Sequence, residues 1–296
     1  MTNQPISKTQ AWWMAARPRT LPATLTPVVL GTAIAAKEGF FSLPVFLATL
    51  AAALLMQIGT NFVNDVADFL RGADKQRKGP TRVTQSGLLS SREVIAGSAV
   101  VFGLATLIGV YLVMVGGWPI LLVGVFAILS AIAYTAGPFP LAYHGLGDVF
   151  AFVFFGLIAV NFTHFLQTHS ITTLSLLCSI PIAFLVTNIL IVNNLRDIDT
   201  DLAANKHTLA TRLGATGTRW QYSIQLGLAY LLLMAIGLAA PASAWRILPA
   251  LTLPLAIRLV RLVWSARELP QFNRALGGTA QLELWFGLAL AVGVLI

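Results

Sequence analysis

Charge is scarce in this chain of 296 residues, because Asp, Glu, Lys and Arg together make up only 10% of it. A soluble domain carries about 25% charged residues. Here 57% of the residues are hydrophobic, and the mean hydropathy is +0.79. This balance excludes an ordinary soluble domain and predicts a protein that crosses a bilayer several times. The net charge of +8 then reflects how loops are distributed across the membrane, so no nucleic-acid partner is expected.

Residues that build many catalytic sites are also rare or dispersed. The single cysteine, Cys178, lies inside an apolar segment, which excludes a disulfide framework and a cysteine-based metal site. The four histidines are scattered along the chain, which argues against zinc. The sequence contains no Walker loop, no Rossmann glycine fingerprint and no Gly-x-Ser-x-Gly elbow. The nucleotide-binding and hydrolase sites that use these motifs are therefore not expected.

Apolar sequence, by contrast, recurs in lengths of about 20 residues, the length that spans a bilayer. The pattern predicts an all-α, polytopic membrane protein with about nine transmembrane helices in a single domain over residues 1–296. Residues 1–19 include Trp12 and Trp13 but no apolar run typical of a signal peptide, so they are expected to lie at the cytoplasmic interface. The predicted helices cover residues 21–36, 43–68, 93–115, 119–136, 146–167, 171–194, 220–240, 244–264 and 279–296.

The lysines and arginines predict the orientation. With the N-terminus in the cytoplasm, every Lys and Arg except Lys37 and Arg246 falls on the cytoplasmic side, in accord with the positive-inside rule. The polar stretches 70–92 and 196–219 fall on the same side and are predicted to be active-site loops. We therefore expect a multi-pass protein of the cytoplasmic (inner) membrane, with the lipid bilayer as its partner and no obligatory protein partner.

Two carboxamides and two carboxylates close the second predicted helix. They are Asn61, Asn64, Asp65 and Asp68. Their spacing of i, i+3, i+4 and i+7 gives them one shared face if the helix continues. A run of basic residues follows immediately in the sequence.

A similar face closes the sixth predicted helix, where Asn193, Asp197 and Asp201 are spaced i, i+4 and i+8. With Asp74 and Asp199, the two clusters hold six of the eleven acidic residues. A solvated helix end would account for a lone aspartate at an interface. Two sets on helical faces, each followed by cations, favour a functional site instead.

Hard oxygen ligands beside cations suit Mg²⁺ bound to a diphosphate, with lysine and arginine neutralising the remaining phosphate charge. The membrane location favours a lipid-soluble organic part, such as a prenyl chain lying among the helices. Departure of pyrophosphate would leave an allylic carbocation for an electron-rich acceptor to attack. Tyr134 lies on the same side and could stabilise a cation with its ring, or it could belong to the interfacial belt of tyrosines.

At these residues the sequence resembles the UbiA-type intramembrane aromatic prenyltransferases. The pair Asn64-Asp65-x-x-Asp68 and Asp197-x-x-x-Asp201 is similar to the two aspartate motifs of that superfamily. Further motifs resemble one branch, the 1,4-dihydroxy-2-naphthoate polyprenyltransferases of menaquinone synthesis, and the resemblance spans most of the chain. These motifs are Arg17-Pro18-Arg19-Thr20-Leu21-Pro22, Asn64-Asp65 through Gly72-x-Asp74, Tyr134-x-x-Gly137-Pro138-x-Pro140-Leu141-Ala142-Tyr143-x-Gly145-Leu146-Gly147, and Asn193-Asn194-x-Arg196-Asp197 through Asn205-Lys206-x-Thr208-Leu209-Ala210-x-Arg212-Leu213-Gly214.

The resemblance implies a helical bundle around a central cavity and dependence on Mg²⁺. It implies transfer of a polyprenyl group from polyprenyl diphosphate to 1,4-dihydroxy-2-naphthoate, with loss of the carboxylate to give demethylmenaquinol. By matching position, the metal ligands would be Asn64, Asp65, Asp68, Asp197 and Asp201, and these aspartates would be catalytic together with Lys75 and Tyr134. The substrate contacts would be Asn61, Asn64, Arg82, Asn193, Arg196, Lys206 and Arg212, with Arg19 as a contact of the acceptor.

Other functions stay open at this stage. Within the same enzyme class, the acceptor could be 4-hydroxybenzoate or homogentisate, and the donor could carry a phytyl chain. An ion-coupled transporter is an alternative from another class. Transporters, however, place ionisable groups near the bilayer midplane on broken helices, whereas these clusters lie at one rim beside basic residues. A non-enzymatic lipid-binding scaffold is the weakest alternative.

Overall fold

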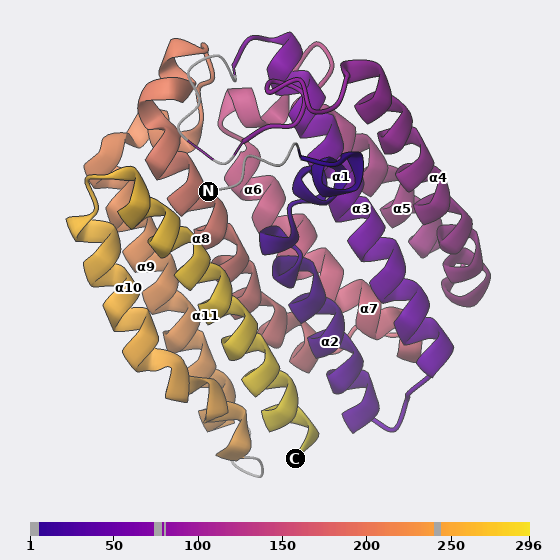
Figure 1. The fold of residues 1–296 in the computed structure, drawn as a ribbon. Coiled ribbons are helices and arrows are strands. Elements are labelled where there is room, and N and C mark those ends of the chain that lie inside the picture. The colour runs from indigo at the N-terminus through magenta and orange to yellow at the C-terminus, as the bar shows by residue number, and fades with distance from the viewer. Residues whose placement is uncertain (1–5, 74–78, 80, 240–243) are drawn as a thin grey trace.

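The computed structural model describes residues 6–73, 79, 81–239 and 244–296, and the side chains of Arg19, Leu238, Ala239 and Ala244 lie outside the described part. Within that part the regular structure is entirely helical, so the predicted all-α class is confirmed (Figure 1). The first elements are α1 (Lys8–Ala16), η1 (Pro18–Thr20), α2 (Pro22–Lys37), α3 (Leu43–Leu70), α4 (Ser91–Gly116) and α5 (Trp118–Ala133). They are followed by η2 (Leu141–His144), α6 (Gly147–Ala151), the π-helical η3 (Phe152–Ile158), α7 (Ala159–Thr168), α8 (Thr173–Ala203), α9 (Leu209–Ala239), η4 (Ala244–Thr252), α10 (Leu253–Ser265) and α11 (Leu269–Leu295).

Helices or continuous helical runs occupy each of the apolar segments that the sequence predicts. Six stretches of the described chain are long and apolar enough to cross a membrane by length and composition, and Trp118–Ala133 is a shorter apolar helix. The six are Leu43–Leu70, Ser91–Gly116, Gly147–Thr168, Thr173–Ala203, Trp245–Ser265 and Leu269–Leu295. The count of nine crossings and the orientation in the membrane stay predictions.

Local sequence signals mark where several helices begin. Ser90 caps α4 and forms a capping box with Glu93, and Thr172 forms the corresponding box with Ser175 at the start of α8. Proline occupies the first turn of α3, α5 and α10, where a helix makes no internal hydrogen bond with that N–H. These caps define helix starts independently of the apolar pattern that predicts the helices themselves.

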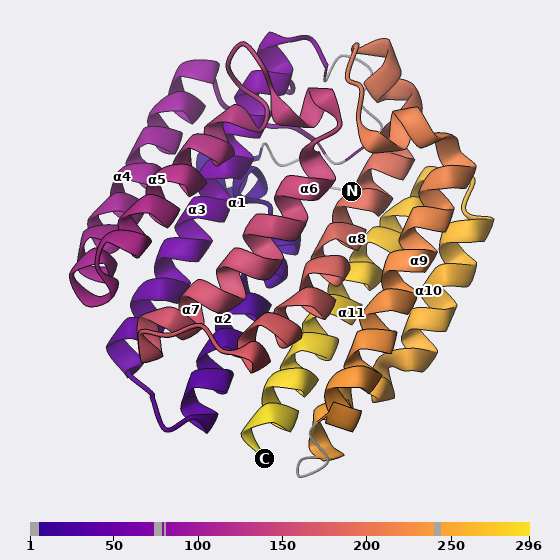
Figure 2. The ribbon, with the colours of Figure 1, turned by 180° about the vertical axis from the view of Figure 1, so that it is seen from behind.

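The helices stand side by side in one bundle. Figures 1 and 2 show α3, α4 and α5 along one edge, α9 and α10 along the opposite edge, and α2, α7, α8 and α11 between them. The largest apolar core joins α2, α8, α9 and α11 around Leu30, Ile182, Tyr222 and Phe286. Helices α2 and α11 approach closely because Gly287 has no side chain, and a Cβ there would overlap Thr26 Cγ2.

The C-terminal ends of α3 and α8, which carry the two acidic faces, lie at the same end of the bundle, at the top of Figure 1. The connections α3–α4, α5–α6 and α8–α9 meet there, and the backbone N–H of His207 donates to the carbonyl of Tyr143 at 3.0 Å. The prediction of a loop over residues 196–219 is wrong, because α8 continues to Ala203 and α9 begins at Leu209. The apolar run ends earlier than the helix does, since polar side chains that pair with one another allow the helical turns to continue.

Helix α1 packs against α3 near this end of the bundle. The contact involves Ala11 and Ala15, and the ring of Trp12 lies 5.3 Å from that of Phe62. Trp13 is exposed on the outer side of the helix. The N-terminal segment is therefore packed onto the bundle along one side, and its continuation through η1 leads directly to the site described next.

Candidate active site

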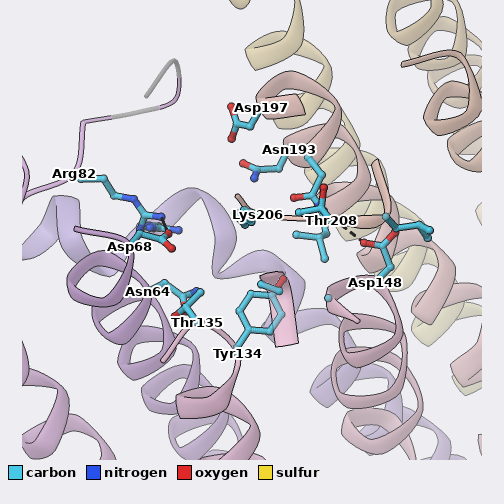
Figure 3. Close-up of a pocket in the computed structure, with 16 residues that line it drawn as sticks. Asn64, Asp68, Arg82, Tyr134, Thr135, Asp148, Asn193, Asp197, Lys206 and Thr208 are labelled. Atoms are coloured by element: carbon cyan, nitrogen blue, oxygen red, sulfur yellow. Dashed lines mark hydrogen bonds and ion pairs between the residues drawn. The ribbon is translucent and has the colours of Figure 1, made fainter. Parts of the chain in front are cut away.

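A cavity opens at the end of the bundle where the two acidic faces meet (Figure 3). It encloses about 570 Å³ of space outside the protein atoms, part of it open to solvent. One wall comes from α3 and the segment 81–89, here called the strap. A second comes from α8 and residues 206–209, and a third from the α5–α6 connection and the start of α6. The described lining residues are Arg17, Asn64, Asp68, Arg82, Tyr134, Thr135, Ala142, Gly147, Asp148, Leu190, Asn193, Asn194, Asp197, Lys206, Thr208 and Leu209.

Asp68 is the carboxylate of the first wall. It is buried and accepts hydrogen bonds from Arg82 Nη2 at 2.8 Å and from Tyr143 Oη at 2.9 Å. Burial, and then the charge of Asp68, raise the pKa of Tyr143, so its phenol keeps its proton and acts as a donor. Asp68 is thus fixed at the cavity edge by one cation and one neutral donor.

Asp65 faces the strap rather than the cavity. Its Oδ1 accepts the backbone N–H of Thr84 at 3.0 Å, and its Oδ2 accepts that of Val83 at 3.3 Å. Val83 is fully buried together with Leu89 in the apolar cluster beneath α1. Since Asp65 fixes the backbone next to Arg82, it holds the strap where that guanidinium meets Asp68.

Asn61 ties the N-terminal segment to α3. Its Nδ2 donates to the backbone carbonyl of Ala16 at 3.0 Å and to Thr20 Oγ1 at 3.3 Å. Arg17, the residue after Ala16, has a φ of 52° in the left-handed region and lines the cavity. The predicted acceptor contact Arg19 has its side chain outside the described part, so Arg17 is the arginine of this segment that the structure brings to the site.

On the second wall, Asp197 pairs with the residue before it. Arg196 Nε donates to Oδ1 at 2.8 Å and Nη2 donates to Oδ2 at 2.7 Å, the two-pronged geometry that makes arginine–carboxylate pairs strong. Nη2 also donates to Asn193 Oδ1 at 2.8 Å. Because Asn193 and Asp197 both line the cavity, Arg196 positions two oxygen-bearing side chains of this wall from behind.

Asp201 lies one turn further along α8 and pairs with Lys206, whose Nζ is 3.2 Å from Oδ1. Burial acts to lower the pKa of Lys206, but the carboxylates of Asp201 and Asp68 outweigh burial and hold that pKa above its ordinary value. The ammonium group of Lys206 therefore stays protonated at neutral pH. Its ammonium also lies 5.7 Å from the centroid of the Tyr143 ring, which links the second wall to the third.

Tyr134 and Thr135 belong to the third wall. Thr135 Oγ1 donates to Asn64 Oδ1 at 2.7 Å and so fixes an amide that faces the cavity. Tyr134 also lines the cavity in this wall. A Cβ on Gly147 would lie 2.9 Å from Tyr134 Oη, so the glycine leaves room for the hydroxyl.

Asp148 follows Gly147 and contributes a further carboxylate to this wall. Gln221 Nε2 donates to its Oδ2 at 2.7 Å, and Asn194 Nδ2 lies at 3.5 Å from its Oδ1. The sequence pattern predicts only that Asp148 favours the N-terminus of its helix. Its place in the cavity depends on how α6 packs against α8 and α9.

The cavity brings together most of the residues predicted for the site, and a few lie elsewhere. Residues that line it directly are Asn64, Asp68, Arg82, Tyr134, Asn193, Asp197 and Lys206, with Arg196 and Asp201 paired to cavity residues. Arg212 is exposed and donates to the carbonyl of His144 at 2.9 Å, which braces the α5–α6 connection. Lys75 lies outside the described residues, as does Asp74. Sequence reasoning missed Arg17, Thr135 and Asp148; the motif Arg17-Pro18 and the acid after Gly147 are the only local signals for them.

The donor set fits Mg²⁺. Figure 3 shows Asn64 and Asp68 of α3 on one side of the cavity, with Asn193 and Asp197 of α8 across from them. Magnesium is commonly held by one or two carboxylates together with substrate phosphates and waters, rather than by a protein cage. Among the described residues, no group of three His, Cys, Asp or Glu side chains that could hold a metal is found. The site therefore suits a metal that arrives with an anionic ligand.

Known proteins resemble this chain over nearly its whole length. Residues 24–292 match the UbiA prenyltransferase family. A 1,4-dihydroxy-2-naphthoate octaprenyltransferase of Haemophilus influenzae is 35% identical, over 98% of this chain and 97% of the relative. A protein of the same description from Escherichia coli is also 35% identical, over 98% of each chain.

Solved structures share the fold at low sequence identity. A UbiA homolog from Aeropyrum pernix, in its apo form, superimposes with a TM-score of 0.69 at 18% identity and covers 91% of this chain and 97% of that one. A UbiA homolog from Archaeoglobus fulgidus, bound to DMAPP and Mg²⁺, has a TM-score of 0.66 at 16% identity and covers 95% of this chain and 99% of that one. These likenesses establish that the helical bundle described above is a known architecture.

Proposed function

The chain belongs to the UbiA prenyltransferase family, and we propose that it transfers a polyprenyl group from polyprenyl diphosphate to 1,4-dihydroxy-2-naphthoate with loss of the carboxylate. It is an integral membrane protein with several helices able to span a bilayer. The observation that carries the proposal is the meeting of two acidic helix ends at one cavity. Three of their carboxylates, Asp68, Asp197 and Asp201, each form an ion pair with an arginine or lysine.

This combination of charges supports a diphosphate ligand. A diphosphate needs both metal ions, which the carboxylates attract, and direct cationic contacts, which arginine and lysine provide. Arg82 and Lys206 stand on opposite walls of the cavity, and Arg17 enters it from the N-terminal segment. We propose these three as the phosphate-facing cations, with Arg196 orienting Asp197. Lys75 and Arg19, expected from the sequence to contact substrate, stay proposals of the same kind.

Magnesium would be held by Asp68, Asp197 and Asp201 with the amides of Asn64 and Asn193. When bound, the metal neutralises phosphate charge and so favours departure of pyrophosphate. The role of the protein is to bring these oxygens to one place before the substrate arrives. Asp65, which the sequence adds to this set, has both oxygens on the strap, and its membership is tested below.

The transfer itself requires little acid–base chemistry from the chain. The bond between the allylic carbon and its diphosphate oxygen breaks, and pyrophosphate leaves with the electron pair. The electron-rich ring forms a new carbon–carbon bond, and its carboxylate leaves as CO₂. Tyr143 holds its proton, so it is not proposed as a base. Tyr134 instead offers its ring and hydroxyl to the reacting groups.

The choice of acceptor is supported by the relatives at 35% identity over 98% of the chain, which carry the name 1,4-dihydroxy-2-naphthoate octaprenyltransferase. The product would be demethylmenaquinol. An active site at the cytoplasmic side of the inner membrane, with the N-terminus in the cytoplasm and nine crossings, is part of the proposal. It is supported by the distribution of Lys and Arg along the chain.

The test is a direct assay of the detergent-solubilised protein with a radiolabelled polyprenyl diphosphate, 1,4-dihydroxy-2-naphthoate and Mg²⁺. We expect a labelled lipid product that disappears with EDTA and returns with excess Mg²⁺. Parallel reactions with 4-hydroxybenzoate and homogentisate should stay blank. If one of those acids gave product instead, the protein would still be a prenyltransferase of this family but with a different acceptor. If folded protein gave no product with any acceptor, the proposed activity would be contradicted.

A further inference from the structure

Asp148 differs from the other aspartates of the cavity in the partners that hold it. Asp68 pairs with Arg82 at 2.8 Å and Asp197 with Arg196 at 2.7 Å. Asp148 is buried, with 6% of its surface exposed, yet it forms no ion pair with a described Lys or Arg. The neutral amides of Gln221 and Asn194 hold it instead. Its carboxyl oxygens therefore have no cation beside them and can accept a further hydrogen bond from a ligand that brings a donor.

Position supports the same conclusion. Figure 3 shows Asp148 on the far side of the cavity from Arg82 and Asp68, with Tyr134 between them. A diphosphate is repelled by a carboxylate that lacks a cation, so it is expected near Arg82 and Lys206 instead. Asp148 thus belongs to the part of the cavity that is left for the acceptor. This step rests on the proposed function.

The acceptor has one hydroxyl that suits this carboxylate. In 1,4-dihydroxy-2-naphthoate the 1-hydroxyl is adjacent to the ring carboxylate and donates to it internally. The 4-hydroxyl has no internal partner, and a buried hydroxyl left without an acceptor is costly. The acceptor carboxylate, on the same ring as the 4-hydroxyl but away from it, is drawn to the cations of the other walls.

We propose that Asp148 is a binding residue for the aromatic acceptor and accepts a hydrogen bond from the 4-hydroxyl. A hydroxyl that donates to a carboxylate forms a strong, short bond. The bond places electron density on the ring oxygen and so on the ring that must supply electrons to the new carbon–carbon bond. Gln221 and Asn194 hold the carboxylate in place without cancelling its charge, which makes them positioning residues.

The experiment measures competitive inhibition by two unreactive analogues that differ only in this hydroxyl, 4-hydroxy-2-naphthoate and 2-naphthoate. For the wild-type protein we expect 2-naphthoate to bind roughly 10- to 100-fold more weakly, the usual worth of a hydrogen bond to a charged group. In Asp148→Asn the ratio should fall to about threefold, because a neutral acceptor forms a weaker bond. The KM for polyprenyl diphosphate should change by less than about twofold.

Matched variants separate recognition from a merely structural role. Glu268→Gln makes the same chemical change at an exposed carboxylate at the start of α11 and should keep the wild-type ratio. Asp148→Glu keeps a carboxylate and should retain more discrimination than Asp148→Asn. Equal inhibition of the wild type by both analogues, or an unchanged ratio in Asp148→Asn, would overturn the assignment while leaving the transferase activity intact. Failure of the wild type to form any product would instead remove the proposed function on which the assignment rests.

Discussion

The carboxylate of Asp65 accepts the backbone N–H of Thr84 at 3.0 Å, so the first aspartate motif holds a segment 19 residues further along the chain. Its second oxygen accepts the N–H of Val83. Asp68, one turn later, turns instead to Arg82 and the cavity. The two aspartates on one helical face therefore have different roles. Asp65 fixes the strap, and Asp68 faces the cavity.

Replacement of Asp65 by alanine should loosen the strap. It leaves two buried N–H groups without their acceptor, which costs about 1–3 kcal/mol each. We expect a lower thermal midpoint in detergent, faster proteolysis within residues 81–89 and reduced turnover, because Arg82 loses its fixed position. The Mg²⁺ concentration for half-maximal activity should stay near that of the wild type. A clear rise in that concentration, with the strap still protected, would show instead that Asp65 binds the metal.

Asp197→Asn should affect the metal dependence directly. It removes a charge from the second wall and leaves Arg196, buried with it, facing a neutral amide. We expect kcat/KM to fall roughly 100-fold or more, on the scale of losing an electrostatic contact in a site, and the requirement for Mg²⁺ to rise. Asn273→Ala provides the control, since Asn273 is exposed and touches the same arginine at 3.2 Å from outside the cavity. Comparable losses in both variants would mean that only the placement of Arg196 matters.

Stability should fall in alkaline solution, and Tyr143 should account for part of the fall. The pKa of Tyr143 is raised in the folded protein, whereas a free phenol loses its proton near pH 10. The unfolded chain therefore releases a proton that the folded chain keeps, so the free energy of unfolding decreases as pH rises above about 10. Lys206, whose pKa is also raised, acts with the same sign. Thermal midpoints between pH 8 and 11 should decline less steeply for Tyr143→Phe than for the wild type, and parallel slopes would contradict this.

The general architecture could be predicted because it depends on composition and local spacing. Long apolar runs predict helices wherever they occur, and helical periodicity predicts that Asn64 and Asp68 share a face. The second acidic face at Asp197 follows from the same reasoning. An even number of crossings between the two faces predicts that they lie at one end of the bundle, and in the structure residues of both faces line one cavity.

The separate roles of the residues in the site could not be predicted from their spacing in the sequence. Asp65 and Asp68 lie on one helical face. Which of them accepts hydrogen bonds from the backbone of the strap depends on how residues 81–89 pack against α3. Asp148 is assigned to the cavity by packing of α6 against α8 and α9, through contacts with Asn194 and Gln221 that are remote in sequence. Arg17 reaches the cavity because Asn61 holds the carbonyl before it. Each of these is a tertiary contact with no local periodic signal.

The opposite end of the bundle offers a stability test that should leave the kinetics unchanged. Glu38 Oε2 lies 2.8 Å from Nε2 of the fully buried His164, and its Oε1 accepts from Thr172 Oγ1 at 3.1 Å. These contacts join the end of α2 to α7 and to the start of α8. Glu38→Gln should lower the free energy of unfolding by about 1–3 kcal/mol, the usual range for a buried polar group that loses its charged partner. Unfolding in denaturant measures the loss, and KM and kcat should match the wild type within about twofold.

Gly147→Ala should narrow the cavity beside Asp148. The added Cβ would lie 2.9 Å from Tyr134 Oη and 3.6 Å from Leu190 Cδ2, so the tyrosine must move. A displaced Tyr134 ring would misplace the acceptor relative to the donor, and small misplacements of reacting groups reduce catalytic rates strongly. We therefore expect kcat/KM for the acceptor to fall about 10-fold or more. Gly124→Ala, on α5 with open space around its Cβ position, is the matched control and should keep full activity. Because the diphosphate is expected on the other walls, the KM for the donor should change little in either variant. An equal loss for donor and acceptor would mean that Gly147 supports the whole cavity and not its acceptor side.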